Sequence, residues 1–343
     1  STDGMGIKHR HFHLHVSDGS LRFDKFPYPL YNVTGDIRVT NDLVTLDNFQ
    51  GSNSNGGSIS CKGMYRIEPP QPYAGDLPPP TPGPSLDLEF DATRIAMDES
   101  LKSSLPPEPR QTWENLSPSG VLDRLKINLG RSSKSGPVGL NIKANQFEAR
   151  GIGSDTLRIQ PKSLPYRMDL VEGSVRYENR QVYIDSIRAQ HGGSVVSANG
   201  SCRPTPSGRW LLTLDVHKGS RLIPDSEFAN ALPETMRGAI RGLNLRGPVR
   251  LSGLTETLLS NEAHPDPVFG WDLVLQLEGN RIGDIGPVHG LRGELSVRGR
   301  KDTNGLVAEG DVGIDSLHVN ELQITRLRGP FRVTDDQLKL GGI

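Results

Sequence analysis

Two blocks of sequence occur twice in this chain, in the same order and with matching residues. The first block begins at Phe26 as FPYPLYNVTGDIRVT and returns at Leu164 as LPYRMDLVEGSVRYE. Its matches are Pro27/Pro165, Tyr28/Tyr166, Val33/Val171, Gly35/Gly173, Arg38/Arg176, Val44/Val182 and Asp47/Asp185. The second block has matches at Arg94/Arg221, Asp98/Asp225, Leu105/Leu232, Pro106/Pro233, Arg110/Arg237, Leu116/Leu243 and Gly120/Gly247. Such ordered duplication predicts a fold that is built from repeated modules.

The duplication divides the chain into parts. We expect a strand within residues 1–16, a first module over 17–153, a second over 154–286 and a truncated third over 287–343. Only the first module carries the proline-rich insertion 68–85, which predicts an extended surface loop that could bind a partner. The N-terminus lacks the apolar stretch of a signal peptide, and the chain stops within the pattern, so we expect a segment of a longer protein.

Apolar and polar residues alternate within the repeats. VTGDIRV at Val33, VEGSVRY at Val171 and LRGPFRV at Leu327 all keep a two-residue period. This period predicts strands with one apolar face and one solvent-exposed polar face, which is typical of antiparallel sheets. Asn, Asp and Gly between the runs indicate tight turns. The predicted fold is mainly β: repeated antiparallel modules that form an elongated curled sheet, a β-groove, with short helical inserts.

Two departures from the strand pattern recur. LPPEPRQTWENL at Leu105 and LPETMRGAIRGL at Leu232 predict one or two helical turns after a proline, which would brace an open edge of the sheet. A glycine between apolar positions predicts a bulge or bend where the sheet curls. This glycine recurs as Gly35, Gly173, Gly293 and Gly329.

Composition excludes several classes of function. The formal net charge of −1 gives no reason to expect a nucleic-acid partner. No run approaches the ~18 apolar residues of a membrane-spanning helix. The two cysteines, Cys61 and Cys202, cannot build a disulfide framework, and the sequence leaves open whether they pair. Nucleophile, phosphate-loop, dinucleotide and zinc-protease motifs are absent from the sequence, so we expect no enzyme, no catalytic residue and no cofactor.

Alternate histidines precede the first module: His9, His11, His13 and His15. Phe12, Leu14 and Val16 lie between and after them, so the histidines share the opposite face of the strand. Same-face neighbours on a strand lie roughly 6.5–7 Å apart, too far to share one tetrahedral zinc without a second strand. We interpret the histidine row as the solvent-exposed face of a strand and expect no metal site. A metal site and a pH response are the alternatives.

The repeated residues resemble the AsmA-like superfamily of Gram-negative envelope proteins, which includes TamB-like members. The resemblance rests on FPYPL, Val-x-Gly-x-Ile-Arg, Val-x-Leu-Asp, Gly-Gly-Ser and the later Leu-Pro block, and it covers nearly the whole chain. These motifs are patterns of apolar residues, glycine and proline rather than catalytic signatures. The proline-rich insertion and the histidine row depart from the family pattern.

The resemblance implies a periplasmic segment of a protein that is anchored in the inner membrane through a part absent from this chain. Its hydrophobic groove would shield phospholipid acyl chains during transport between the inner and outer membranes. The alternative is a non-conducting periplasmic scaffold that assists outer-membrane biogenesis or protein assembly. Outer-membrane or envelope proteins would then be further partners. A glycan-binding repeat fits poorly, because Trp113, Trp210 and Trp271 offer few exposed aromatic platforms.

The alternation also predicts the residues that would line the groove: Val33, Ile37, Val39, Val44, Leu46, Val171, Val175, Val182, Ile184, Phe331 and Val333. A second sheet packed on this face would leave lipid no path. The recurrent glycines would alternatively let an acyl chain approach the backbone. We expect Asp47 and Asp185 to be strand-end residues or cross-strand partners. We expect the outward-facing Arg38, Arg176 and Arg332 to pair with neighbours as well, the alternative for the arginines being contact with lipid headgroups.

Overall fold

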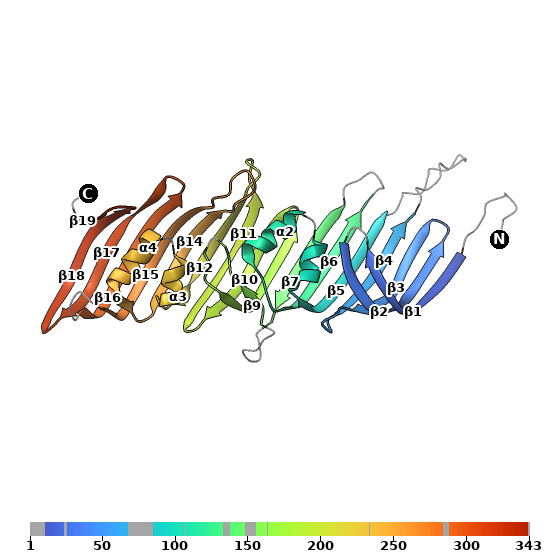
Figure 1. The fold of residues 1–343 in the computed structure, drawn as a ribbon, viewed down its shortest axis with the longest axis horizontal. Helices are drawn as coiled ribbons and strands as arrows, with labels where there is room; N and C mark the ends of the chain where they lie inside the picture. Colours follow the sequence, from blue (N-terminus) through green and yellow to red (C-terminus); the bar gives the residue numbers. More distant parts are fainter. Residues whose placement is uncertain are drawn as a thin grey trace.

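The chain forms one long twisted sheet. The computed structural model describes residues 11–23, 26–67, 85–105, 107–132, 138–147, 156–162, 164–232, 234–283 and 288–341. Strands lie across the long axis, and the chain progresses from one end of the molecule to the other (Figure 1). Within the described residues, the sheet contains 19 antiparallel strands and is not closed, which confirms the predicted fold class. Residues 68–84 of the proline-rich insertion 68–85, His9 and the expected module boundaries at 153/154 and 286/287 lie outside the described residues.

The elements follow the order of the repeat. The first part contains β1 (His11–Phe23), β2 (Phe26–Thr40), β3 (Leu43–Ser52), β4 (Ser58–Arg66), β5 (Leu86–Ala96), α1 (Glu99–Ser104), α2 (Pro107–Leu116), β6 (Val121–Arg131) and β7 (Gly139–Gln146). The second contains β8 (Arg158–Ile159), β9 (Met168–Glu178), β10 (Gln181–His191), β11 (Ser194–Pro204), β12 (Trp210–Leu222), α3 (Ser226–Ala231), α4 (Glu234–Leu243), β13 (Leu245–Arg246), β14 (Val249–Leu258) and β15 (Val268–Ile282). The third contains β16 (Val288–Asp302), β17 (Gly305–Val319), β18 (Leu322–Thr334) and β19 (Leu338–Leu340).

Most strands pair with their neighbours in sequence, as in a meander. The two short strands β8 and β13 continue the lines of β7 and β14, because each pairs with the remaining length of β9 or β15. Pairing between β7 and β9 joins the first part to the second, and pairing between β15 and β16 joins the second to the third. The modules of the sequence are therefore parts of one continuous sheet.

The matched residues of the two repeats make the same contacts. Asp98 and Asp225 cap the N-termini of α1 and α3, and their carboxylates accept hydrogen bonds from the backbone N–H three residues later, at 2.9 and 2.8 Å. Arg110 donates to the carbonyls of Ser103 and Leu105. Arg237 donates in the same way to Asn230 and Leu232. The second repeated block therefore encodes a helix pair whose connection is held by one arginine.

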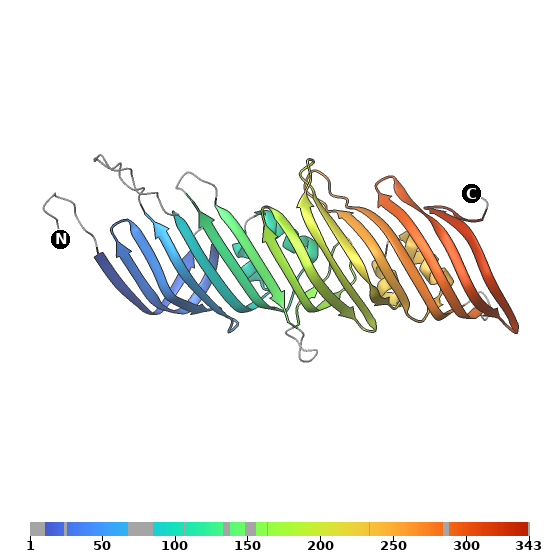
Figure 2. The same cartoon turned by 180° about the vertical axis from the view of Figure 1, so that it is seen from behind.

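The helix pairs lie on one face of the sheet and not at its edge. They stand in front of the strands in Figure 1 and behind them in Figure 2. Leu101 of α1 and Trp113 of α2 pack on the sheet residues Ile95 and Leu122. The expectation that the helices brace an open edge is therefore wrong. Their amphipathic sequence finds apolar partners on the face, whereas an edge offers mainly backbone hydrogen bonds.

Three of the four recurrent glycines lie where the strand register shifts. Gly35 and Gly293 adjoin irregular pairings, and Gly173 lies between two of them. A Cβ on Gly35 would approach Phe49 to 2.5 Å, so a neighbouring side chain already takes the space expected for an acyl chain. Gly329 is different, because its pairing is regular and open space surrounds it. The bulge prediction is confirmed at three positions and wrong at Gly329.

Candidate functional site on the apolar face

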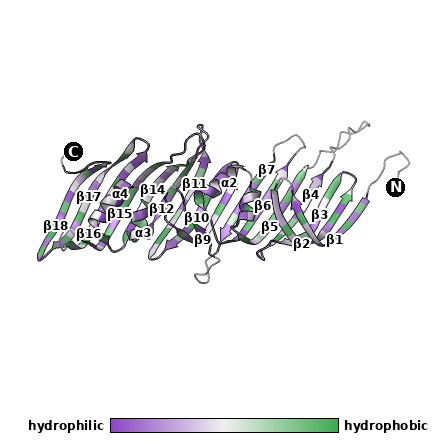
Figure 3. Ribbon diagram, in the orientation of Figure 1, coloured by the Kyte–Doolittle hydropathy of each residue, from purple (hydrophilic) through white to green (hydrophobic). Residues whose placement is uncertain are grey.

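One face of the sheet carries a continuous line of apolar and small residues. Residues directly opposite each other in antiparallel pairs point to the same face. A chain of such opposite pairs crosses the sheet from β3 to β19, and its members all point to one face. These residues are called row A: Gly51, Ile59, Ala92, Leu125, Ala144, Val175, Ile184, Gly200, Leu214, Thr255, Trp271, Gly299, Ala308, Val333 and Leu338. Thr255 is its one hydroxyl. Figure 3 shows the alternation of hydrophobic and hydrophilic residues along the strands that produces this face.

A second line, row C, runs beside row A on the same face. Its members are Phe49, Cys61, Phe90, Ile127, Ile142, Tyr177, Val182, Cys202, Leu212, Thr257, Phe269, Lys301 and Leu306. At a strand spacing of ~4.8 Å, this line is roughly 60 Å long. The apolar face is therefore several acyl-chain widths long and almost free of charge.

The structure places ten of the eleven predicted lining residues on this face. Val175, Ile184 and Val333 belong to row A, and Val182 belongs to row C. Ile37, Leu46, Val39 and Val44 continue the face into β2 and β3, and Phe331 lies in the line of Gly310. Val33 is buried, and an added Cβ on Gly51 would lie 3.2 Å from its Cγ2. Val171 falls at the register shift between β9 and β10.

The opposite face is polar and charged. Lys126, Lys143 and Arg176 lie opposite one another in register, with Asp91 next in line. The Arg124 guanidinium beside Asp91 holds the pKa of that carboxyl below its ordinary value. The two faces therefore differ in chemistry along the whole sheet.

The repeated acids and arginines pair across neighbouring strands, as expected. Arg38 contacts Asp47 at 3.4 Å, and Arg176 contacts Asp185 at 2.9 Å. Arg176 lowers the pKa of Asp185. Arg332 lies opposite Glu309 in register on the same polar face. Contact of these arginines with lipid headgroups has no support from this arrangement.

No second sheet packs on the apolar face among the described residues. The first helix pair covers part of the apolar face, because Leu101 and Trp113 share an apolar cluster with the row A residues Ile59, Ala92, Leu125 and Ala144 of β4 to β7. At the N-terminal end of the sheet the face is uncovered, since Phe12 is 62% exposed and Leu14 56%. Most of the predicted lining residues are half-buried by their neighbours within the sheet itself.

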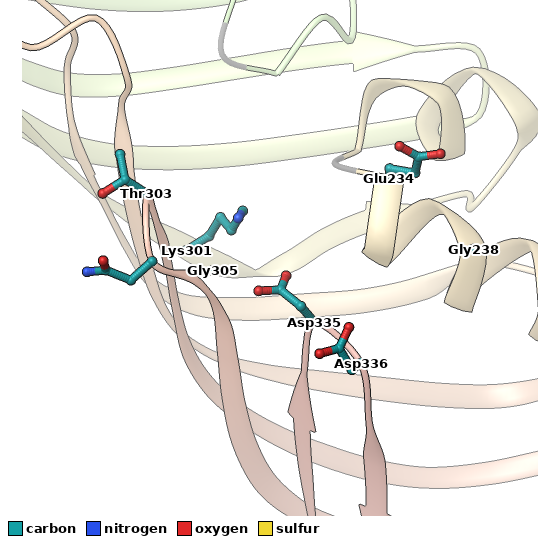
Figure 4. A pocket seen from close by; sticks show the side chains of 8 residues that line it. Glu234, Gly238, Lys301, Thr303, Gly305, Asp335 and Asp336 are labelled. Carbon is teal, nitrogen blue, oxygen red and sulfur yellow. The ribbon is translucent and has the colours of Figure 1, made fainter.

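Toward the C-terminal end, the sheet curls until its strand turns face α4. A cavity of about 680 Å³ lies between α4 and the turns after β16 and β18. Figure 4 shows Lys301 extending from its strand toward α4, with Asp335 and Asp336 beside it and Glu234 on the helix. At this end, α4 and polar strand turns therefore border the apolar face. The apolar face together with the helices and strand turns that border it is here called the trough.

Both cysteines lie in row C and are free. Six strand spacings of ~4.8 Å separate them, or about 29 Å, so they cannot form a disulfide within the chain. Burial raises the pKa of each thiol to about 11 from an ordinary value of 9.0.

The raised pKa of Cys61 and Cys202 predicts slow alkylation. At pH 8, about 100-fold fewer thiolates are present than for an ordinary thiol, because each pKa unit above the pH is a factor of ten. We expect iodoacetamide to modify both cysteines at least 10-fold more slowly in the folded chain than in 6 M guanidinium chloride. Mass spectrometry of each peptide measures both rates. Equal rates in the two conditions would contradict the assigned burial.

The described histidines of the N-terminal row lie on the polar face, as expected. His13 Nε2 and His15 Nδ1 approach the same oxygen of Asp36, at 3.0 and 3.1 Å, and His11 contacts Thr40. The hydrogen bond from His15, followed by that from His13, lowers the pKa of Asp36. Within the described ranges, no group of three or more His, Cys, Asp or Glu residues is arranged to hold a metal ion.

Several residues of the face were missed by the sequence prediction. Ile59, Phe90, Ile127 and Ile142 belong to rows A and C. Ile59 lies near the end of the first matching block and was not chosen, while the other three lie outside both blocks. Their signal is present in SISCKGMY, LDLEFDA and LKINL, which keep the same two-residue period. No comparable sequence period indicates that Leu101 and Trp113 pack on the apolar face, because the placement of a helix depends on tertiary packing.

Comparisons of this chain with protein families, with characterised proteins and with solved structures return no match. Among the helices of the described residues, none combines the length and hydropathy of a membrane span. The fold and the site define the chain as a repeat-built open β-sheet whose apolar face, within the described residues, is covered in part by helices and by no second sheet.

Proposed function

We propose that this chain is a lipid-handling segment whose apolar face shields phospholipid acyl chains. The observation that carries the proposal is the continuity of rows A and C across an open sheet, with no second sheet over them in the described part of the chain. A globular sandwich would fill such a face with side chains of a facing sheet. An apolar surface of this length on a soluble protein marks a binding site.

The energetics suit acyl chains. Each methylene group that leaves water contributes about 0.8 kcal/mol, so a chain of ~15 methylenes contributes on the order of 12 kcal/mol. Aliphatic, aromatic and small residues make up most of the face, and they accept a flexible hydrocarbon without requiring specific polar contacts. Movement along the trough needs no catalytic group. We propose the periplasm as the location and an AsmA-like bridge between the inner and outer membranes as the setting, on the resemblance of the repeated motifs.

A direct test compares lipid bound by matched variants. We expect the purified chain to retain phospholipid, measured by native mass spectrometry and by organic extraction. Val175→Asp/Ile184→Asp places two charges at the centre of row A and is expected to lower bound lipid at least five-fold. Tyr183→Asp is the control, because Tyr183 neighbours Ile184 but lies on the polar face opposite Arg176.

Folding of each variant is checked by circular dichroism and by the cooperativity of melting. A control that retains lipid beside a folded double variant that loses it supports the proposal. A wild-type chain that folds cooperatively, carries no lipid and takes up none from phospholipid vesicles would refute it. A scaffold that organises assembly factors would then be pursued instead.

A further inference from the structure

The trough has two long edges, which are formed by the ends of the strands and the connections between them, and these two edges differ in construction. One edge, here called the helical edge, gives rise to both helix pairs, after β5 and after β12. The other, here called the open edge, is formed in its described parts by connections without helices at residues 41–42, 179–180, 205–209, 259–267, 303–304 and 335–337. It is the upper edge of the sheet in Figure 1. Beside the first helix pair, an amphiphile that enters the trough from solvent meets the open edge first, because α1 and α2 cover the apolar face at the other edge. At the C-terminal end, α4 lies across a cavity from the open-edge turns after β16 and β18.

At the open edge, the apolar face ends in amphipathic side chains. Tyr65 and Arg131 flank Leu86 in register, and Trp210 lies two residues before Leu212 of row C. Lys301 is the cation of row C, between Phe269 and Leu306. Tyr, Trp, Arg and Lys place an apolar body on a hydrophobic surface and a polar tip in water. This composition is typical of the boundary between hydrocarbon and headgroups.

The two cations are available to a ligand. Arg131 donates to Ser85 Oγ at 3.0 Å, and Lys301 donates to the Asp302 carbonyl at 3.3 Å. In the described part of the chain, neither one forms an ion pair with a carboxylate at salt-bridge distance. Glu234, Asp335 and Asp336 line the same cavity as Lys301. A headgroup that carries a phosphate and a cationic amine matches this mixture of charges better than a net anion does.

The distance from the open edge to the helices fits an acyl chain. Tyr65 lies at the open edge, and Ile59, six residues along β4, packs against the cluster that contains Leu101 of α1. Six residues of strand span about 20 Å. One leaflet of a bilayer holds its acyl chains in about 15 Å, which is half of the ~30 Å hydrocarbon core. A phospholipid can therefore lie along the strands, with its chain ends at the helices.

From these observations we infer that phospholipids bind the trough in one orientation, with their headgroups at the open edge, where Arg131 and Lys301 provide two separate cations, and their acyl chains directed toward the helical edge. This inference rests on the proposed function and adds to it a direction across the trough. The tryptophans provide built-in reporters, because Trp210 lies at the open edge and Trp113 lies in the helical cover.

Spin-labelled lipids test the orientation. Two single-tryptophan chains are made, Trp113→Phe/Trp271→Phe and Trp210→Phe/Trp271→Phe. Each is loaded from vesicles with phosphatidylcholine that carries either a nitroxide on the headgroup or one at carbon 16 of an acyl chain. The chain is separated from the vesicles, and a phosphorus assay measures bound lipid before fluorescence is read. We expect the headgroup label to quench Trp210 at least two-fold more than the acyl label does, and the reverse for Trp113.

The outcomes separate the two proposals. Bound lipid with equal or reversed quenching would overturn the orientation and leave the lipid-binding function standing. No bound phosphorus with a folded chain would refute the function and the orientation together. Arg131→Gln/Lys301→Gln is expected to weaken lipid binding at least three-fold. Lys62→Gln/Arg298→Gln, which removes paired cations of the polar face, is expected to leave it unchanged. Equal losses in both variants would also overturn the headgroup assignment.

Discussion

Replacing Ile95 by alanine is expected to lower the free energy of unfolding by about 2–5 kcal/mol, because the change removes a fully buried side chain and leaves a cavity. Ile95 is 2% exposed and packs in the cluster that joins Leu101 of α1 and Trp113 of α2 to the sheet. The side chain is therefore central to the attachment of the first helix pair. Urea unfolding followed by Trp113 fluorescence in a Trp210→Phe/Trp271→Phe background measures this decrease in stability at the first helix pair.

The matched control is Val307→Ala. Val307 is 46% exposed and points to the polar face of β17, opposite Thr334. Its truncation is expected to change stability by less than about 0.5 kcal/mol. Similar losses for Ile95→Ala and Val307→Ala would show that the helix pair is not anchored through this cluster.

Gly63→Ala is expected to cost about 2–4 kcal/mol, since strain and a steric clash act together. Gly63 has φ +139°, a conformation that residues with a Cβ rarely adopt. A Cβ built there would lie 2.0 Å from the carbonyl oxygen of Asp87 on the neighbouring strand, so backbone would have to move. The midpoint of urea unfolding, followed by far-UV circular dichroism, measures the effect.

Gly130→Ala provides the comparison for Gly63→Ala. Nothing lies within 4 Å of a Cβ built on Gly130, and its φ is not in the positive range. We expect a change of less than about 0.5 kcal/mol there, or a slight stabilisation through the unfolded chain. If the two alanine variants were equally stable, the close approach of β4 and β5 at Gly63 would be wrong.

Much of the fold could be predicted because the two-residue period and the duplication are local properties of the sequence. The strands, the polar partners of Asp47 and Asp185, and the bulges at Gly35 and Gly173 all follow from residues that repeat in register. Helix placement could not be predicted, because Leu101 and Trp113 pack on an apolar surface that several strands form together and that exists only after the sheet forms. Gly329 carries the same local signature as Gly35 but lies in a regular pairing.

The phase of the apolar face could also be predicted, whereas its full extent could not. Val175 and Ile184 follow from alternation within one strand each, but row A requires the register of all its strands. The choice of residues followed the matched blocks, so it missed Phe90 and Ile127 of β5 and β6, which lie outside the blocks and extend the face. The asymmetry between the open and helical edges depends on which connections carry helices, and on the side to which those helices fold.

The most direct test of the central claim is photocross-linking along a single strand. Positions 174, 175, 176 and 177 of β9 are replaced one at a time by p-benzoylphenylalanine, and each chain is irradiated with phosphatidylcholine vesicles. Val175 and Tyr177 face the trough, while Ser174 and Arg176 face solvent on the polar side. We predict lipid adducts, detected by mass spectrometry, at positions 175 and 177 and at most one-fifth of that yield at 174 and 176. Equal yields at all four positions, or adducts confined to 174 and 176, would contradict lipid binding on the apolar face.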